Sequence, residues 1–491
     1  MTTHETGTST EASALPDPAA LERRLADLVG SLSLEQQVRL LTGADMWTTY
    51  GEPAIGLRPM VLSDGPSGVR GAIWDERDPS LNLPSATALS ASWDPELAYR
   101  YGQVAAAEAI RKGVDVVLGP TINLHRSPLG GRHFEAYSED PLLTGVIGAA
   151  YVRGVQSAGI AACPKHYVAN DFETERYTAS VTVDERALRE LYLAPFEQAV
   201  QAGAWTVMSA YNAVAGVTMS ENDLLRDPLC EEWGFDGLVV SDWTAVRSVA
   251  AARARQDLAM PGPDGAWGPA LVAAVRAGEV PAEAVEEKVR RLLRLAVRVG
   301  ALGEPTSDRP RPIIDVGFAR EAEARGIVLV RNAGQLLPLA APASIAVSGQ
   351  NAELPRTQGG GSATVVPSEI ISPLAGLRQA LPGAVVGYRL GAVVQEGIAP
   401  LPVETLTDPE TGAAGCGCGS ATRPARWCWR RCGSPAPWCG WATRRPATWR
   451  AWRSSPTTGR PRPGRSSSAS PGWAGRCSPS TASRCCRRIP R

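Results

Sequence analysis

The sequence predicts an α/β protein built on a parallel sheet, and three observations support that prediction. Short apolar runs recur between residues 60 and 242, and each run ends in a polar, charged or glycine-rich loop. Amphipathic stretches of helical length lie between the runs. Strand, loop and helix in repeated alternation are typical of a parallel α/β sheet. The length from about residue 20 to 300 suits one (β/α)8 TIM-like barrel with insertions.

Two helices are expected before the sheet begins. Apolar residues recur at helical spacing from Leu21 to Leu32, and Ser33 with Gln36 forms a capping box for a second helix, which Gly43 ends. Longer helices are expected between the apolar runs. They cover residues 95–112, 141–158, 185–202 and an amphipathic stretch at 285–296.

Five apolar runs are expected to form buried parallel strands, because they lack the polar alternation of a strand with one wet face. They are residues 60–64, 114–120, 159–164, 205–210 and 237–242. A doubly wound sheet is the alternative topology. No GxGxxG or Walker loop follows any of these strands, which weakens a nucleotide-binding interpretation.

Composition divides the chain into five parts. Residues 1–17 are expected to be a disordered leader, residues 18–302 the barrel, and residues 303–312 a linker rich in Pro, Gly and charge. A partial α/β sandwich domain follows at 313–415, with helices at 318–326 and 374–381 and strands at 327–330, 344–349 and 384–388. The glycine-rich loop 359–363 either approaches a ligand closely or forms a plain turn.

The fifth part, residues 416–491, differs from the rest of the chain in composition. It holds half of the 14 tryptophans and most of the cysteines, with frequent arginine but no lysine and no acidic residue. Without aliphatic residues other than alanine and one isoleucine it cannot bury a core. We interpret this disordered tail as the product of a shifted reading frame. The alternatives are an arginine-rich nucleic-acid segment and a cysteine metal site, but the paired C-x2-C spacing of zinc ribbons is missing.

The body of the chain is expected to be soluble and cytoplasmic. Only Cys163 and Cys230 precede the tail, which predicts a reducing compartment without a disulfide framework. The first residues lack the apolar stretch of a signal peptide, and no apolar run reaches the length of a membrane span. We therefore expect no membrane partner.

Chemically active residues follow several of the predicted strands. The stretch 237–243 runs from three apolar residues directly into Asp242 and Trp243. A carboxylate at a strand end suits a barrel active site, and the alternative is a cap of the next helix. Similar motifs stand at residues 63–70, 123–132, 134–141, 165–167 and 208–212. In this combination and order the body resembles glycoside hydrolase family 3, the β-glucosidase family, over about residues 33 to 375.

The resemblance implies a retaining hydrolase whose nucleophile is Asp242. Such an enzyme needs one ionised carboxylate and a second carboxyl, acting as acid and base, about 5–5.5 Å away. An ionised Asp242 requires positive neighbours, and we expect Lys165, Arg126 and Arg70 to supply them. The resemblance assigns the sugar-binding positions to Asp64, Arg70, Arg126, Lys165, His166, Met208, Tyr211 and Trp243. Taken singly, His166, Lys165 and Tyr211 also have ordinary structural interpretations.

The sequence departs from the family pattern at the acid/base. Glu135, Glu139 and Glu173 are expected to form structural ion pairs with barrel arginines, and the resemblance places the acid/base Glu in the second domain. Residues 400–413 resemble the lead-in to an inserted PA14-type module, and Glu410 is the last carboxylate of the chain. We therefore expect the acid/base to be missing and activity to be severely impaired, since general acid catalysis contributes about 10²–10⁴-fold.

The predicted function is a β-glucosidase-type hydrolase acting on a terminal β-linked glucosyl residue. The expected partner is a β-glucoside or oligosaccharide, without cofactor, metal or nucleic acid, and homo-oligomerisation of the intact protein is left open. The alternatives are a catalytically dead sugar-binding remnant, β-xylosidase or α-arabinofuranosidase specificity, and an arginine-rich nucleic-acid binder. β-N-Acetylglucosaminidase activity is disfavoured, because residues 165–170 lack that branch's glycine-rich loop.

Overall fold

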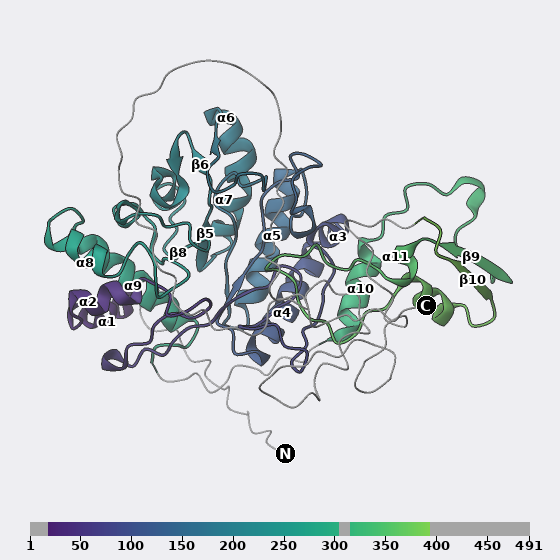
Figure 1. Ribbon diagram of the computed structural model, residues 1–491, viewed down its shortest axis with the longest axis horizontal. Helices are drawn as coiled ribbons and strands as arrows, with labels where there is room; N and C mark the ends of the chain where they lie inside the picture. The colour runs from purple at the N-terminus through teal and green to yellow at the C-terminus, as the bar shows by residue number, and fades with distance from the viewer. Residues whose placement is uncertain (1–17, 304–314, 393–491) are drawn as a thin grey trace, which may run out of the picture. The chain divides into compact units, whose positions relative to one another are not determined.

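The computed structural model describes residues 18–303 and 315–392 (Figure 1). The predicted leader at 1–17 and the predicted tail at 416–491 lie outside the described residues. So do all but the first residue of the predicted linker and residues 393–415 of the predicted second domain. Among the described helices, none is long and apolar enough to cross a membrane.

The five expected parallel strands all form, each shorter than the apolar run that predicts it. They are β1 (Leu62–Asp64), β2 (Val116–Leu118), β3 (Ala161–Ala162), β5 (Thr206–Ser209) and β8 (Leu238–Ser241). A small separate sheet consists of β4 (Ser180–Val181), β6 (Ala213–Val214) and β7 (Val217–Thr218).

The parallel strands belong to two short sheets, β1-β2-β3 and β5-β8. Backbone hydrogen bonds join the sheets, since Tyr167 N–H donates to the Met208 carbonyl over 2.7 Å. Beyond β8, Leu258 N–H donates to the Val239 carbonyl over 3.0 Å, and Ala259 N–H donates to the Leu41 carbonyl over 2.9 Å. The α/β prediction is confirmed, but the described strands do not form one continuous eight-stranded barrel sheet.

Helices follow the strands largely where the amphipathic patterns predict them. Ser33 and Gln36 form the expected capping box at the start of α2. The stretch 185–202 is interrupted, because a π-helical segment at Leu188–Leu193 separates α6 from α7. The helices of this part are α1 (Pro18–Gly30), α2 (Leu34–Leu40), α3 (Ala86–Ala91), α4 (Pro95–Arg111), α5 (Pro141–Gln156), α6 (Glu185–Ala187), α7 (Ala194–Gln201), α8 (Pro269–Arg276) and α9 (Ala282–Arg298).

Both faces of the parallel strands are buried, as their uninterrupted apolar composition predicts. Successive side chains of a strand point to opposite faces, so Val117 and Val239 pack with α4, α5 and α7 in one apolar cluster. Their neighbours Leu118, Met208 and Val240 belong to a second cluster with α1, α2 and α9. The second face is the one whose strand ends carry the chemically active residues.

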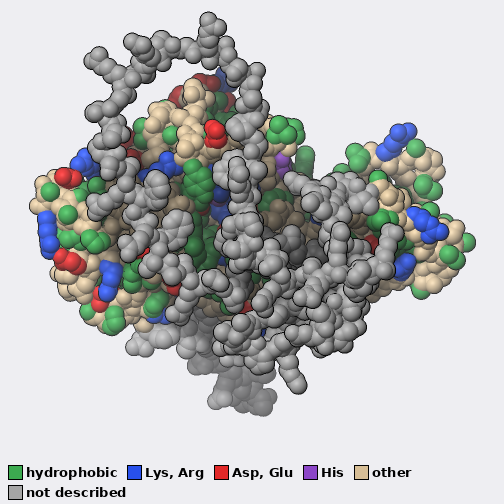
Figure 2. Space-filling model, viewed as in Figure 1, with side chains coloured by type: hydrophobic (Ala, Val, Ile, Leu, Met, Phe, Trp, Pro, Cys, Tyr) green, Lys and Arg blue, Asp and Glu red, His purple; other side chains and the backbone are tan. Residues whose placement is uncertain are grey.

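Ion pairs as well as apolar contacts join the helices α1, α2, α8 and α9. Arg276 of α8 pairs with Glu35 of α2, and Arg294 of α9 pairs with Glu22 of α1 over 2.8 Å. Figure 2 shows basic and acidic side chains interspersed at this end of the molecule. Exposed pairs of this kind each contribute at most about 1 kcal/mol, so the apolar face of α9 dominates the packing.

The later part of the described chain contacts the first part through specific bonds. The Trp74 indole N–H donates to the Thr364 carbonyl over 2.7 Å, and Ser80 N–H donates to the Val366 carbonyl over 2.8 Å. The Arg100 guanidinium of α4 pairs with Glu321 of α10 over 2.9 Å. The helices and strands of this later part are α10 (Val316–Gly326), β9 (Ser344–Ser348), α11 (Gln350–Glu353), α12 (Pro373–Ala380) and β10 (Val385–Arg389).

The prediction of a strand at residues 327–330 is wrong. These residues follow α10 without pairing to any described strand, and the side chain of Val330 is 94% exposed. The predicted strands at 344–349 and 384–388 form, as β9 and β10, and pair in parallel, but both outer edges of this pair lack a partner among the described strands. An apolar run becomes a strand only where a neighbouring backbone satisfies its N–H and C=O groups.

The crossing of α4 and α5 gives a stability prediction. A Cβ at Gly154 of α5 would overlap the Tyr99 carbonyl oxygen of α4, so Gly154→Ala forces these helices apart. We expect a loss of about 1–3 kcal/mol in unfolding free energy, measured by urea denaturation. The matched control is Gly30→Ala at the end of α1, where a Cβ meets nothing within 4 Å. Equal effects of the two substitutions would contradict this packing.

Candidate active site

A cavity of about 490 Å³ lies at the carboxyl ends of the parallel strands. β1, β2, β5 and the segments after β3 and β8 all supply lining residues, so positions far apart in sequence meet there. The lining includes most of the predicted site residues, namely Asp64, Lys165, His166, Met208, Tyr211, Asp242 and Trp243. Residues 359–362 of the glycine-rich loop also line it, which places their backbone at the site rather than in a remote turn.

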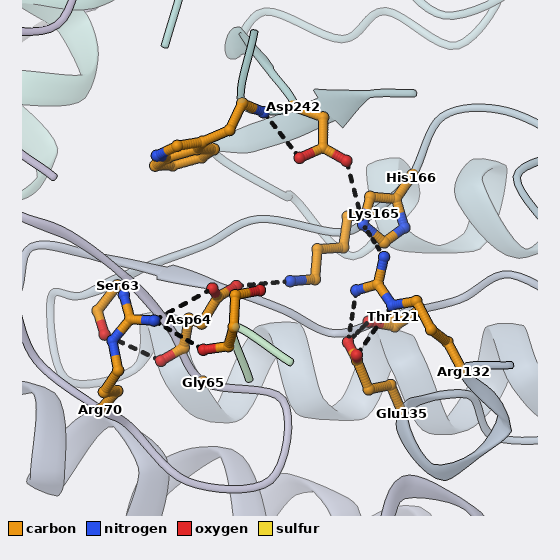
Figure 3. Close-up of polar contacts among 12 residues, drawn as sticks. Ser63, Asp64, Gly65, Arg70, Thr121, Arg132, Glu135, Lys165, His166 and Asp242 are labelled. Carbon is orange, nitrogen blue, oxygen red and sulfur yellow. Dashed lines mark hydrogen bonds and ion pairs between the residues drawn. The ribbon is translucent and has the colours of Figure 1, made fainter. Parts of the chain in front are cut away.

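Asp64 is the most tightly held carboxylate of the cavity. Its Oδ1 accepts a hydrogen bond from the Lys165 ammonium over 2.9 Å, and its Oδ2 lies 3.6 Å from the Arg70 guanidinium (Figure 3). Burial by itself would raise the pKa of Asp64, but Lys165 and Arg70 outweigh it and lower the pKa below the usual value. Asp64 is therefore ionised and can accept hydrogen bonds from hydroxyl groups.

Arg70 does not line the cavity but supports it from behind Asp64. Its guanidinium lies between two indoles, 3.9 Å from the ring centre of Trp47 and 4.2 Å from that of Trp74. Its NH1 donates to the Ser362 carbonyl over 2.7 Å. Arginine suits this position because its flat cation stacks on rings while its edge still donates hydrogen bonds. Arg70 thus links the glycine-rich loop to the floor of the site.

Asp242 follows β8 and lines the cavity. Its Oδ1 accepts the N–H of Trp243 over 2.8 Å, whereas its Oδ2 is buried and has no hydrogen-bond partner among the described residues. Burial raises the pKa of Asp242 above its usual value, while Arg132 and Lys165 lower it in part. A buried carboxylate oxygen without a donor costs free energy, and a ligand that donated to Oδ2 would remove that cost.

Arg132 is the cation that the sequence interpretation missed. Its Nε and NH2 form a bidentate pair with Glu135, at 2.9 Å and 2.8 Å, and its NH1 lies 3.2 Å from His166 Nε2. Figure 3 shows this chain of contacts running from Glu135 through Arg132 and His166 to Asp242. Arg132 lines the cavity and lowers the pKa of Asp242.

Arg126 is not where the sequence interpretation expected it. Its Nε donates to the Tyr192 hydroxyl over 3.1 Å, and it is not among the residues lining the cavity. Arg126 and Arg132 belong to one loop, so strand-end position alone does not separate them. The signal that favours Arg132 is Glu135 three residues later, in the 3-10 turn His133–Glu135, which aims the guanidinium inward.

The glutamates of this region are ion-paired in part, as expected. Glu135 pairs with Arg132, and Glu173 pairs with Arg176 over 2.7 Å. Burial raises the pKa of Glu173 above its usual value, even though Arg132 and Arg176 lower it. Glu139 forms no salt bridge with any described residue, so the expected pairing is absent there. Within the described residues, no cluster of three or more His, Cys, Asp and Glu side chains could hold a metal ion.

Aromatic side chains form a second wall of the cavity. Trp47 and Trp243 lie with ring centres 5.0 Å apart, and the Trp243 indole N–H donates to the Met46 carbonyl over 2.8 Å. Tyr211 contacts Tyr177 with ring centres 4.4 Å apart. Trp47 was missed because nothing in its local sequence marks it. Flat apolar faces beside carboxylates and cations are suited to bind a sugar ring, which has both apolar and hydroxyl surfaces.

Two family models match the chain. The N-terminal domain of glycosyl hydrolase family 3 matches residues 28–295, and the family's C-terminal domain matches residues 327–460. The chain belongs to glycosyl hydrolase family 3. The first match contains every site residue described above from Trp47 to Trp243, and the second contains the glycine-rich loop.

Curated relatives of this family 3 chain are β-glucosidases by name. A "Beta-glucosidase" of Rhizobium radiobacter is 48% identical over 372 residues, covering 73% of this chain and 45% of the relative. A "Probable beta-glucosidase J" of Aspergillus fumigatus is 40% identical over 406 residues, covering 80% of this chain and 47% of the relative. The family 3 chain thus spans about half the length of the curated relatives it matches.

Solved β-glucosidase structures are also similar to this chain in fold and sequence. The β-glucosidase of Kluyveromyces marxianus in complex with glucose has a TM-score of 0.72 at 35% identity, covering 79% of this chain and 48% of that one. β-Glucosidase 3B of Thermotoga neapolitana in complex with α-D-glucose has a TM-score of 0.69 at 35% identity, covering 74% of this chain and 55% of that one.

The charges around Asp242 predict a pH response. A carboxylate attacks only when ionised, so with Asp242 as the expected nucleophile, trapping by a 2-fluoroglycoside should be lost as the pH falls through its raised pKa. Arg132→Gln removes a charge that lowers this pKa, so the acid limb of the trapping rate should move to higher pH.

Arg126→Gln is the matched control, because it removes an arginine of the same loop that contacts Tyr192 instead. We expect its acid limb to stay in place. A shift with Arg126→Gln and none with Arg132→Gln would restore the assignment made from sequence.

Proposed function

We propose that this chain has the active site of a retaining β-glucosidase, with Asp242 as the nucleophile. The observation that carries the proposal is Asp242 itself, a buried carboxylate after β8 that lines the cavity together with the cations Arg132 and Lys165. The β-glucosidase names of the relatives, and the glucose held by two of the solved structures, support glucose as the sugar.

In the proposed reaction, Asp242 Oδ2 forms a bond to the anomeric carbon while the bond to the leaving oxygen breaks. Lys165 and Arg132 stabilise the carboxylate before attack. Asp64 accepts hydrogen bonds from sugar hydroxyls, and the Lys165 ammonium next to it donates hydrogen bonds to sugar oxygens. Water then cleaves the glycosyl–Asp242 ester, and two displacements retain the anomeric configuration.

We propose that this chain lacks an efficient acid/base. Besides Asp242, the carboxyls that line the cavity within the described residues are Asp64, Glu135 and Glu173. Asp64 and Glu135 are engaged in close ion pairs, and Glu173 is paired with Arg176. An acid that protonates the leaving oxygen needs a proton to give, and the ion pairs of Asp64 and Glu135 oppose that role. The raised pKa of Glu173 makes it the described carboxyl whose acid role needs a direct test. Substrates with poor leaving groups should therefore react slowly.

We also propose that the two parallel sheets are parts of a (β/α)8-type barrel spanning residues 18–302. The backbone bonds from the segment after β3 to β5, from β8 to Leu258 and from Ala259 to Leu41 support a curved, continuing sheet. The segment after Leu41 returns to β1, because Leu62 N–H donates to the Trp47 carbonyl over 2.8 Å. This hydrogen bond places Trp47 beside β1, at the cavity that β1 and the segment after β8 line.

Leaving-group chemistry tests the proposed function. A dinitrophenyl β-glucoside needs no acid for departure, so we expect a burst of one dinitrophenolate per site followed by slow turnover. Azide should accelerate the second phase and yield the β-glucosyl azide, because an anion needs no general base. Asp242→Asn should abolish the burst and the azide product together.

Two other outcomes separate the alternatives. A wild-type chain that binds glucose but gives no burst would be a sugar-binding remnant, and the catalytic proposal would fail. Turnover of alkyl glucosides that Glu173→Gln alone abolishes would assign the acid role to Glu173 and overturn the proposed impairment.

The sugar-binding role of Asp64 is tested by Asp64→Asn. The amide keeps the shape of the carboxylate but loses the charge that pairs with Lys165 and Arg70. A hydrogen bond to a charged group contributes about 1.5–3 kcal/mol, so the burst rate at low substrate should fall roughly 10–150-fold. The control is Asp236→Asn, an exposed pair with Arg298 on α9, which should leave the burst rate unchanged.

A further inference from the structure

The Asn123 side chain contacts three atoms of His166. Its Nδ2 donates to the His166 carbonyl over 3.0 Å, and its Oδ1 accepts the His166 backbone N–H over 2.8 Å. The same Oδ1 lies 3.0 Å from His166 Nδ1. Both side chains are buried, with Asn123 6% and His166 2% exposed. The amide therefore holds the backbone and the ring of His166 at once.

These contacts determine which ring nitrogen carries the proton. A carbonyl oxygen only accepts and a backbone N–H only donates, so His166 itself fixes which end of the Asn123 amide is oxygen. An amide oxygen cannot donate, so His166 Nδ1 must donate to it. The hydrogen of the neutral imidazole is thus on Nδ1.

The other ring nitrogen is an acceptor by the same reasoning. Nε2 lies 3.2 Å from NH1 of Arg132, which has only hydrogens to offer. The charged groups that face the ring are Arg132, Lys165 and Arg176, which oppose a second proton, and Asp242, whose Oδ2 lies 3.6 Å from Nε2. Burial and the three cations together hold the pKa of His166 well below its usual value.

We propose that Asn123 is a positioning residue that holds His166 as the neutral Nδ1–H tautomer, so that His166 gives no proton to Asp242. The Nε2 lone pair then accepts from Arg132 and carries no proton toward Asp242, so Asp242 Oδ2 keeps the lone pair that attacks. The protonated alternative would place an N–H donor 3.6 Å from Oδ2 and engage the reacting atom. This inference rests on the proposed function, because it assumes that Oδ2 is the atom that attacks.

Nitrogen NMR of the histidine-labelled chain reads the tautomer directly. The chain has four histidines, and His166→Gln identifies the signal of interest. We expect a protonated, pyrrole-type shift for Nδ1 and a bare, pyridine-type shift for Nε2, unchanged between pH 5 and pH 8. A protonated Nε2, or an imidazolium signal in that range, would overturn the proposal.

Asn123→Asp tests the positioning role at nearly constant shape. A carboxylate against Nδ1 stabilises the imidazolium, so we expect Nε2 to gain a proton as the pH falls. Trapping of Asp242 by a 2-fluoroglycoside should slow along the same titration curve. A neutral His166 and an unchanged trapping profile in this variant would contradict the assignment.

The matched control is Asn222→Asp. Asn222 is also buried, donates from Nδ2 to the Val214 and Val217 carbonyls, and accepts the Leu224 N–H, but it contacts no histidine. This variant loses a similar amide donor and should leave the His166 signals unchanged. If Asn123→Asp does not fold, the wild-type spectrum still decides the tautomer. A wild-type chain that shows Nδ1–H but is never labelled at Asp242 would support the tautomer and overturn the proposed function.

Discussion

The buried ion pair between Lys165 and Asp64 is the interaction on which the rest of the site depends. Lys165 is 2% exposed and Asp64 5% exposed, so both charges are largely removed from bulk solvent. Removing one partner of such a pair leaves an uncompensated buried charge, which costs about 3–5 kcal/mol. The two residues come from different strand ends, Asp64 from β1 and Lys165 from the segment after β3. Their pairing therefore requires the sheet to be assembled.

The pairing of buried charges extends across the cavity. Its carboxylates, Asp64, Glu135 and Glu173, each contact a cation, and the cations Lys165, Arg132 and Arg176 each contact a carboxylate. Asp242 is the exception, since Arg132 and Lys165 lie near it but its Oδ2 accepts no hydrogen bond from either of them. A buried carboxylate oxygen that accepts no hydrogen bond, in a site whose other charges are paired, raises the free energy of the folded protein. A ligand that donates to that oxygen would lower it again.

Much of the fold could be predicted, because the periodicity of apolar residues is a local property. The buried runs became β1, β2, β3, β5 and β8, and the capping box at Ser33 formed as expected. The run 327–330 failed for a non-local reason. Its apolar composition is that of a strand, but no described strand offers it a partner. Local patterns report the tendency to form a strand, whereas pairing depends on the rest of the chain.

The sequence by itself determined the family motifs and the position of Asp64, Lys165, His166 and Asp242 at strand ends, because strand ends follow from local patterns. Only the tertiary structure decided between Arg126 and Arg132 as the cation near Asp242, since two arginines of one loop differ only in where the loop aims them. It also brought Trp47 and the glycine-rich loop to the cavity. Those contacts join segments distant in the chain, and spacing along a sequence carries no information about them.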